Sequence, residues 1–160
     1  MVHVIYGPQG AGKSTLANKI CIEQNAICFS IDEYMSRLFL ADIPVPLDME
    51  FIMERVKRCE GLIWKTVTDF ERTGVTSVLD LGLLKISDRN RIKKLINFHG
   101  FEYLFHFIDA PLAQRKERVI SRNVKRGSDF SFEVTSEMFD YMELQFEPPS
   151  NDELLEIKVY

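Results

Sequence analysis

The feature that most constrains the fold is an eight-residue glycine-rich segment near the start of the chain. Residues Gly7 to Ser14 read GPQGAGKS and match the pattern G-x-x-x-x-G-K-[S/T]. Residues 2–6 form a short β-branched run typical of a buried parallel strand, and apolar residues recur at helical spacing from Ser14 onward. Between a strand and a helix, backbone N–H groups and the helix dipole can bind a phosphate. The segment therefore predicts a phosphate-binding loop.

The spacing within this loop assigns a role to each part of it. Gly10 and Gly12 let the backbone curl around a phosphate, and Lys13 reaches the β- and γ-phosphates. The Ser14 hydroxyl is a predicted ligand of a magnesium ion that bridges these phosphates. We therefore expect Mg²⁺ and a nucleoside triphosphate, ATP with GTP left open, as cofactors. The predicted nucleotide-binding residues are Gly7, Gln9, Gly10, Ala11, Gly12, Lys13, Ser14 and Thr15.

Short apolar runs alternate with helical patterns along the rest of the chain. The expected strands are 2–6, 26–29, 75–79, 103–108 and 154–159, and the later expected helices are 33–40, 48–73, 89–98, 112–124 and 135–146. This alternation predicts an α/β protein with a five-stranded parallel sheet flanked by helices on both faces. With one phosphate loop in a chain long enough for one core, we expect a single domain with a three-layer, nucleoside-kinase-like P-loop NTPase fold.

Charge is distributed unevenly along the chain. Twenty Lys and Arg against 24 Asp and Glu give a net charge of −4, so we expect neither a large electropositive surface nor a nucleic-acid partner. Residues 85–126 hold 11 basic and four acidic residues, whereas residues 129–160 hold nine acidic residues and one lysine. The molecule should therefore be electrically polarised.

The cysteines and histidines have no spacing typical of metal sites or catalysis. Three cysteines, an odd number, are expected as reduced thiols, which favours a cytoplasmic location. His106 lies inside an apolar run and is expected to be a hydrogen-bonded core residue. The opening apolar run has no basic leader and is too short for a signal peptide or membrane span, so no membrane partner is expected.

Two aspartates that follow predicted strands are candidates for the chemistry. The carboxyl end of a parallel strand borders the ligand crevice, so Asp32 is predicted as the general base for a substrate hydroxyl. Asp32 is alternatively the cap of the helix over residues 33–40, and one residue can serve both ends. Asp80 is predicted to face the magnesium ion, or to be a structural turn residue. Leu81 follows it in place of a glutamate, which disfavours a hydrolytic motor.

Four arginines after the fourth strand share one side of a predicted helix. They stand at positions Arg115, Arg118, Arg122 and Arg126, within about 80° of one another around the axis. A solvated basic face is the simplest interpretation of any one of them. As a group they favour a mobile lid over residues 111–128, because guanidinium groups suit phosphate oxygens. The predicted catalytic residues are Lys13, Asp32, Arg118, Arg122 and Arg126.

Together these segments resemble the polynucleotide-kinase-like branch of small P-loop kinases. This AAA family includes phage polynucleotide kinase, chloramphenicol phosphotransferase and zeta-toxin relatives. The resemblance covers nearly the whole chain and rests on residues 7–15, 30–33, 78–82, 88–91, 109–111 and 118–127. It implies an ATP-dependent phosphotransferase with Asp32 as the base, Asp80 near the metal or the acceptor, and a lid arginine among Arg118, Arg122 and Arg126.

One position departs from the pattern of polynucleotide kinases, which place an arginine three residues after the first aspartate. Met35 stands there, and the nearest arginine, Arg37, lies about 200° further around a helix. With the negative net charge, this favours a small-molecule hydroxyl acceptor such as a nucleoside, a sugar or an antibiotic. Two alternatives stay open. One is a nucleotide-binding regulatory protein or slow ATPase without an acceptor, and the other is a 5′-hydroxyl nucleic-acid kinase.

Overall fold

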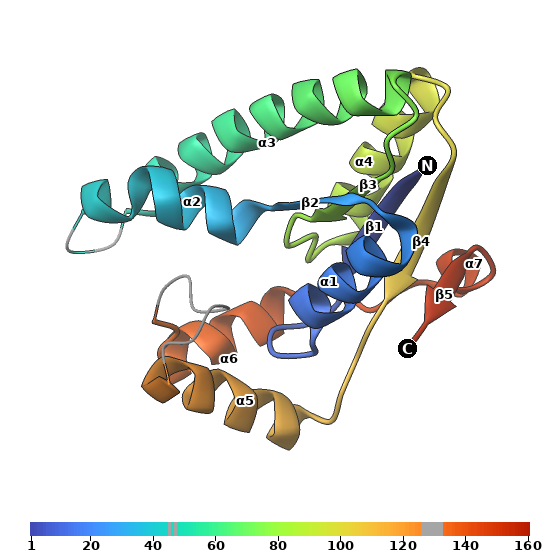
Figure 1. Ribbon diagram of the computed structural model, residues 1–160. Coiled ribbons are helices and arrows are strands. Elements are labelled where there is room, and N and C mark those ends of the chain that lie inside the picture. The colour runs from blue at the N-terminus through green and yellow to red at the C-terminus, as the bar shows by residue number, and fades with distance from the viewer. Residues whose placement is uncertain (45, 47, 126–132) are drawn as a thin grey trace.

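Strands and helices alternate along the chain in the computed structural model, which describes residues 1–44, 46, 48–125 and 133–160 (Figure 1). The strands are β1 (Val2–Tyr6), β2 (Ile27–Ser30), β3 (Ser77–Asp80), β4 (Tyr103–Phe107) and β5 (Ile157–Val159). The helices are α1 (Lys13–Gln24), α2 (Ile31–Phe39), α3 (Met49–Arg72), α4 (Ile86–Phe98), α5 (Leu112–Lys125), α6 (Ser136–Gln145) and α7 (Asn151–Leu154). A short 3-10 helix, Leu40–Asp42, follows α2.

The five strands form one parallel sheet with the order β2-β3-β1-β4-β5. β1 lies at its centre, where Val2 pairs with Ser77 of β3 on one side and Tyr103 of β4 on the other. The predicted α/β fold with a five-stranded parallel sheet is therefore confirmed. Because all strands run the same way, the segments that follow β1, β2, β3 and β4 meet at one edge of the sheet.

Helices cover both faces of the sheet because successive side chains of a strand point to opposite sides. Val4 of β1 belongs to the larger apolar cluster, to which α3 contributes Ile63 and α4 contributes Ile92. Its neighbour Ile5 belongs to a second cluster, to which α1 contributes Ile20. All five side chains are almost completely buried. The result is the three-layer arrangement that the alternation of elements predicts.

The longest helix, α3, begins and ends at signals that the sequence contains. The Asp48 carboxylate accepts hydrogen bonds from the backbone N–H groups of Glu50 and Phe51, at 2.9 and 3.2 Å, and so caps the first turn. The helix stops just before Gly74, whose φ of +80° suits a residue without a side chain. Within the described ranges, neither α3 nor any other helix has the length and apolar character that crossing a membrane requires.

The last predicted strand, 154–159, is wrong in its first half. Ser150 and Glu153 form a reciprocal capping box, with 3.2 Å from the Glu153 N–H to the Ser150 hydroxyl and 2.9 Å from the Ser150 N–H to the Glu153 carboxylate. This cap starts the short helix α7, which takes up Leu154. The strand β5 begins only at Ile157 and pairs with β4.

A buried hydrogen-bonded chain links two histidines of neighbouring strands to the last residue. His3 Nδ1 lies 2.9 Å from His106 Nε2, and His106 Nδ1 lies 3.0 Å from the Tyr160 hydroxyl. Burial lowers the pKa of His106 to about 4 and also lowers the pKa of His3. His106 is therefore the hydrogen-bonded core residue that the sequence predicts.

Candidate active site

The predicted phosphate-binding loop connects β1 to α1 at the carboxyl edge of the sheet (Figure 1). Its backbone packs tightly against the connection from β4 into α5. A Cβ atom at Gly7 would lie 2.0 Å from the carbonyl oxygen of Ile108, and one at Gly10 would lie 2.5 Å from that of Arg115. Gly10 also has a φ of +77°. These two positions therefore require glycine for space as well as for backbone conformation.

The loop leads directly into the first turn of α1. Gly12 precedes the helix in the left-handed region, so no capping side chain competes for the first N–H groups of α1. Ala11 is buried and donates its N–H to the Pro8 carbonyl oxygen at 3.3 Å, which closes the bend, whereas Thr15 is exposed. The free N–H groups and the positive end of the helix dipole make this turn suited to a phosphate.

Lys13 is folded onto the backbone of the same loop. Its Nζ donates hydrogen bonds to the carbonyl oxygens of Gly7 and Pro8, at 3.1 and 3.0 Å. The ammonium group therefore lies against the first two residues of the predicted phosphate-binding loop. A single positive charge held there complements the negative charge of a polyphosphate.

Ser14 and Asp80 lie side by side although they are far apart in the sequence. The Ser14 hydroxyl donates a hydrogen bond of 3.0 Å to the Asp80 carboxylate at the end of β3. Asp80 is 7% exposed. Burial raises the pKa of its carboxyl group, the charge of Asp32 raises it further, and Lys13 and the Ser14 hydrogen bond oppose the shift. An anionic Asp80 therefore needs a nearby cation.

The oxygen atoms of Ser14 and Asp80 fit a magnesium ion that is completed by phosphate oxygens and water. Mg²⁺ prefers oxygen ligands and is commonly bound by one or two protein groups with the substrate phosphates. Within residues 1–44, 46, 48–125 and 133–160, no group of three or more His, Cys, Asp or Glu side chains could hold a metal ion alone. The pair therefore suits a metal that arrives with the nucleotide.

Asp32 lies in the first turn of α2, at the same edge of the sheet. The cap of this helix is Ser30, whose hydroxyl accepts a hydrogen bond of 3.4 Å from the Glu33 N–H. The alternative interpretation of Asp32 as the helix cap is therefore wrong, because the helix already begins at Ile31. The Asp32 side chain is exposed, yet its charge acts on Asp80. The two carboxylates therefore lie close enough at this edge of the sheet for their charges to interact.

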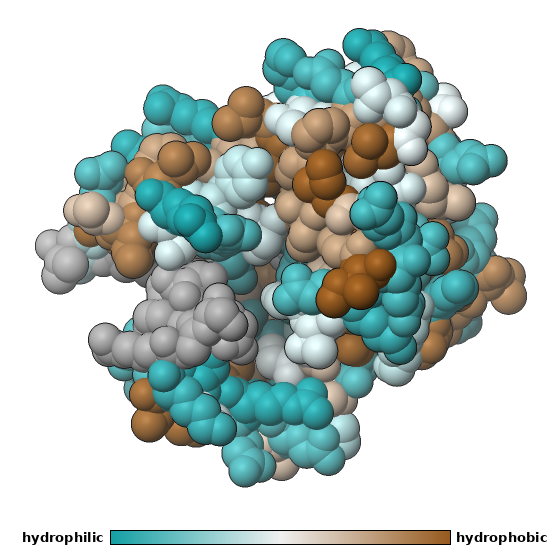
Figure 2. Space-filling model, viewed as in Figure 1, coloured by the Kyte–Doolittle hydropathy of each residue, from teal (hydrophilic) through white to brown (hydrophobic). Residues whose placement is uncertain are grey.

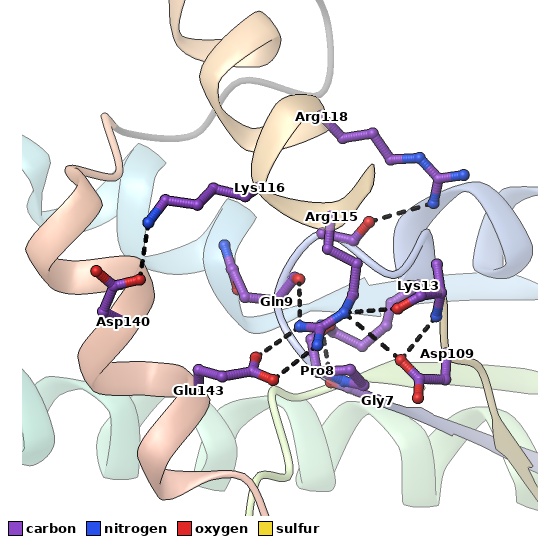
Figure 3. Close-up of polar contacts among 12 residues, drawn as sticks. Gly7, Pro8, Gln9, Lys13, Asp109, Arg115, Lys116, Arg118, Asp140 and Glu143 are labelled. Atoms are coloured by element: carbon purple, nitrogen blue, oxygen red, sulfur yellow. Dashed lines mark hydrogen bonds and ion pairs between the residues drawn. The ribbon is translucent and has the colours of Figure 1, made fainter. Parts of the chain in front are cut away.

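Of the four arginines, Arg115 differs most from the sequence-based interpretation (Figure 3). It is 5% exposed, and its guanidinium group forms a two-point ion pair with Glu143 of α6, at 2.6 and 2.7 Å. Its Nη1 also donates to the Gln9 carbonyl oxygen at 3.3 Å, and its Nε donates to the Ala110 carbonyl oxygen at 2.8 Å. A solvated basic face is therefore wrong for Arg115, because α5 turns this residue toward the phosphate loop and α6.

The other arginines of the predicted lid have separate surroundings. Arg118 is exposed, and its Nη1 lies 3.3 Å from both the Gly10 and the Ala11 carbonyl oxygens. Arg122 is half-buried, and its Nε has no hydrogen-bond partner within the described part of the chain. Arg126 lies outside the described residues. The three arginines that the structure describes thus have different surroundings.

The side of α5 opposite to these arginines is exposed. Ala113, Ile120 and Val124, which the helical spacing places there, all face solvent, with Val124 80% exposed. Figure 2 shows a mainly hydrophilic lower edge of the molecule, where α5 lies, with an apolar patch near the C-terminal end of that helix. The helix instead packs through Val119, which joins Val134 and Phe139 in a small apolar cluster.

Two buried ion pairs were not found by sequence reasoning. Besides Arg115 and Glu143, Arg89 of α4 pairs with Glu153 through two contacts of 2.7 and 3.0 Å, and its guanidinium lies 4.6 Å from the ring centre of Tyr6. Arg89 is 1% exposed. The sequence offers only a basic stretch followed by an acidic tail, a pattern that does not identify which charges meet.

The fold and the phosphate loop together define a P-loop protein of the small kinase-like class. A sequence model of the AAA domain family AAA_33 matches residues 2–149, and the chain belongs to this family. No curated protein matches the sequence.

Solved structures support the same class. A sugar kinase from Janibacter sp. HTCC2649 is 20% identical with a TM-score of 0.66, over 99% of this chain and 83% of that one. A gluconokinase from Sinorhizobium meliloti 1021 is 16% identical with a TM-score of 0.60, over 99% and 80% of the two chains. Kti12 from Chaetomium thermophilum, in complex with ADP-AlF3, is 14% identical with a TM-score of 0.67, over 100% and 88%. At these identities the likeness establishes the kinase-like fold.

Proposed function

We propose that the protein is an ATP-dependent phosphotransferase that moves the γ-phosphoryl group to a hydroxyl of a small molecule. The observation that carries this proposal is the position of Asp32. Its carboxylate lies in the first turn of α2, beside the Ser14 and Asp80 pair, and is close enough to raise the pKa of Asp80. A phosphate site with a second carboxylate beside the metal ligands suits transfer to an acceptor.

Each residue in the proposed site has a separate role. The loop amides and Lys13 bind the β- and γ-phosphates, and Ser14 and Asp80 would hold a magnesium ion, which would offset phosphate charge. Asp32 accepts the proton of the acceptor hydroxyl while the hydroxyl oxygen forms a bond to the γ-phosphorus. The bond between that phosphorus and the bridging oxygen breaks, and ADP leaves. Arg118, Arg122 or Arg126 stabilises the charge on the transferring group.

Three observations favour a small-molecule acceptor over a nucleic acid. Met35, at the position where polynucleotide kinases place an arginine, is 8% exposed and belongs to the large apolar cluster. The next arginine, Arg37, is exposed and pairs with Glu33 at 2.8 Å. The similar structures named above include a sugar kinase and a gluconokinase. We therefore place sugars first among the candidate acceptors, followed by nucleosides.

The test is the variant Asp32→Asn, assayed with γ-phosphate-labelled ATP and a panel of sugars and nucleosides. We expect label transfer to fall by at least about a hundredfold, while the Kd of Mg·ATP changes by less than about twofold, because the base acts on the acceptor. The matched control is Glu33→Gln, which removes the neighbouring carboxylate in the same helical turn.

Two results would contradict the proposal. If Asp32→Asn transfers label as well as the wild type does, Asp32 is not the base. If the wild type labels no acceptor in the panel and only hydrolyses ATP slowly, a regulatory nucleotide-binding protein becomes the better account. Labelled oligonucleotides with 5′-hydroxyl ends, included in the same panel, test the nucleic-acid kinase alternative.

A reducing, cytoplasmic setting is part of the same proposal. Cys21, Cys28 and Cys59 are all free thiols. Burial raises the pKa of each, and that of Cys28 to about 12. Thiols held in the neutral form are poor nucleophiles, so the proposed reaction does not use them.

A further inference from the structure

Cationic side chains hold five successive carbonyl groups of the phosphate loop. Lys13 donates to the carbonyl oxygens of residues 7 and 8, Arg115 to that of residue 9, and Arg118 to those of residues 10 and 11. Lys13 belongs to the loop itself, whereas the two arginines come from α5, about 100 residues further along the chain. The conformation of the loop therefore depends on a distant helix.

Holding a carbonyl group also orients an amide. In a trans peptide unit the C=O of one residue and the N–H of the next point in opposite directions. The contact from Arg115 to the Gln9 carbonyl therefore fixes the direction of the Gly10 N–H. Glycine at this position leaves the peptide unit free to rotate when nothing holds it. By holding the Gln9 carbonyl oxygen, Arg115 restricts this rotation and leaves the Gly10 N–H on the opposite side of the peptide unit.

Arg115 is itself held in place by α6. Glu143 accepts hydrogen bonds from both terminal nitrogens of the Arg115 guanidinium, at 2.6 and 2.7 Å. The other acidic neighbour of Arg115 is Asp109, which is half-exposed and whose carboxylate lies 3.5 Å from Arg115 Nε. The pair raises the pKa of Arg115 and lowers that of Glu143, so both groups stay charged. A two-point pair fixes the plane of the guanidinium group as well as its position.

We propose that Glu143 is a positioning residue of the nucleotide site, which holds Arg115 so that the Gly10 amide faces the phosphates of bound ATP. Helix α6 would then contribute to the nucleotide-binding site through Arg115. This inference rests on the proposed binding of Mg·ATP by the loop.

The structure offers a matched control on the same two helices. Lys116 of α5 pairs with Asp140 of α6 at 3.0 Å, and Figure 3 shows this pair beside the Arg115 and Glu143 pair. Both side chains of the control pair are exposed, and among the described residues no hydrogen bond joins either of them to the loop. If the two ion pairs served only to join the helices, removing either pair should have the same effect on Mg·ATP binding.

The experiment compares Glu143→Gln, Arg115→Lys and Asp140→Asn in the full chain, with the Kd of Mg·ATP from calorimetry and thermal unfolding as readouts. The neutral amide in Glu143→Gln cannot pair with the guanidinium charge, and a lysine at position 115 cannot reach Glu143 and Gln9 together. We expect the first two variants to weaken Mg·ATP binding by about tenfold and Asp140→Asn by less than about twofold. The KM for ATP should rise with little change in kcat.

Several outcomes decide the inference. It is overturned if Glu143→Gln, folded as judged by circular dichroism, binds Mg·ATP as the wild type does, or if Asp140→Asn weakens binding equally. If Glu143→Gln fails to fold, Arg115→Lys, which keeps an ion pair with Glu143, decides by the same criterion. A wild-type protein that gives no heat with Mg·ATP refutes the proposed function itself, whereas a wild type that binds normally confines any failure to the role of Glu143.

Discussion

The phosphate loop has two sides that are built in different ways. On the phosphate side, Lys13 and Ser14 belong to the loop motif, and Asp80 follows β3 directly. On the carbonyl side, Arg115 and Arg118 come from the first two turns of α5, and Arg115 is held by α6. The first side is fixed by strand ends, whereas the second depends on how two helices pack.

The difference follows from what each side has to do. The phosphate side must exchange water for a charged ligand, and Ser14 and Asp32 accordingly remain exposed, although Asp80 beside Ser14 is buried. The carbonyl side must not move, and its central cation is buried with its charge paired. A buried charge without its partner is costly, so this side tolerates change poorly. Mutations on the two sides should therefore affect different properties: chemistry on one, and loop geometry on the other.

The largest effect is expected from the phosphate side, in Lys13→Met. Methionine keeps the length of the side chain and removes the positive charge, which lies against the Gly7 and Pro8 carbonyl oxygens and is proposed to bind the phosphates. We expect turnover of ATP to fall by at least about a hundredfold, with the fold retained. Steady-state assays and circular dichroism measure this. Lys19→Met, on the exposed side of the same helix, is the control and should keep full activity. Normal turnover in Lys13→Met would refute the assignment of the loop.

The next largest effect is expected from Gly10→Ala, which tests the packing of the carbonyl side. Gly10 and Gly74 have nearly equal φ values, +77° and +80°, so alanine meets similar backbone strain at both. Only at Gly10 would the new Cβ also meet a carbonyl oxygen, that of Arg115, at 2.5 Å. We expect Gly10→Ala to lower the free energy of unfolding by about 2 kcal/mol more than Gly74→Ala does. Equal losses in urea unfolding would contradict this.

The smallest effect is a difference in pH dependence between the two sides. Burial raises the pKa of Asp80 and the pair with Arg115 lowers that of Glu143, so acid protonates Asp80 first while Glu143 stays ionised. As pH is lowered from neutral toward the ordinary aspartate value, the advantage of the wild type over Asp80→Asn in Mg·ATP affinity should shrink.

The advantage of the wild type over Glu143→Gln in Mg·ATP affinity should stay constant over the same pH range. Ratios of Kd between variants cancel the protonation of ATP itself. A ratio for Glu143→Gln that falls in step with that for Asp80→Asn would show that the two sides titrate together, against this prediction.

The two groups also change the stability of the fold in opposite directions as pH falls. The raised pKa of Asp80 favours the folded state as pH falls, and the lowered pKa of Glu143 favours it above about pH 4.5, the ordinary glutamate value.

Much of the phosphate side could be predicted because local patterns determine it. The loop motif fixes Lys13 and Ser14 one after the other, and a parallel sheet places the residue that ends β3 at the same edge. The helix over residues 112–124 was also found, since its period is in the sequence. The roles of Asp32, Asp80 and the lid arginines stay predictions.

The sequence alone determined the class of fold, because strands that alternate with helices around a glycine-rich loop predict a parallel sheet covered by helices. In that sheet the phosphate loop and the end of β3 lie at the same edge, which brings Ser14 to Asp80. Only the tertiary structure decided that Arg115 faces inward and meets Glu143. A helical period states which residues share a side, but the direction of that side depends on partners 28 and 106 residues away, Glu143 and Gln9. Such contacts depend on how α5 and α6 pack beside the phosphate loop, which no local pattern in the sequence specifies.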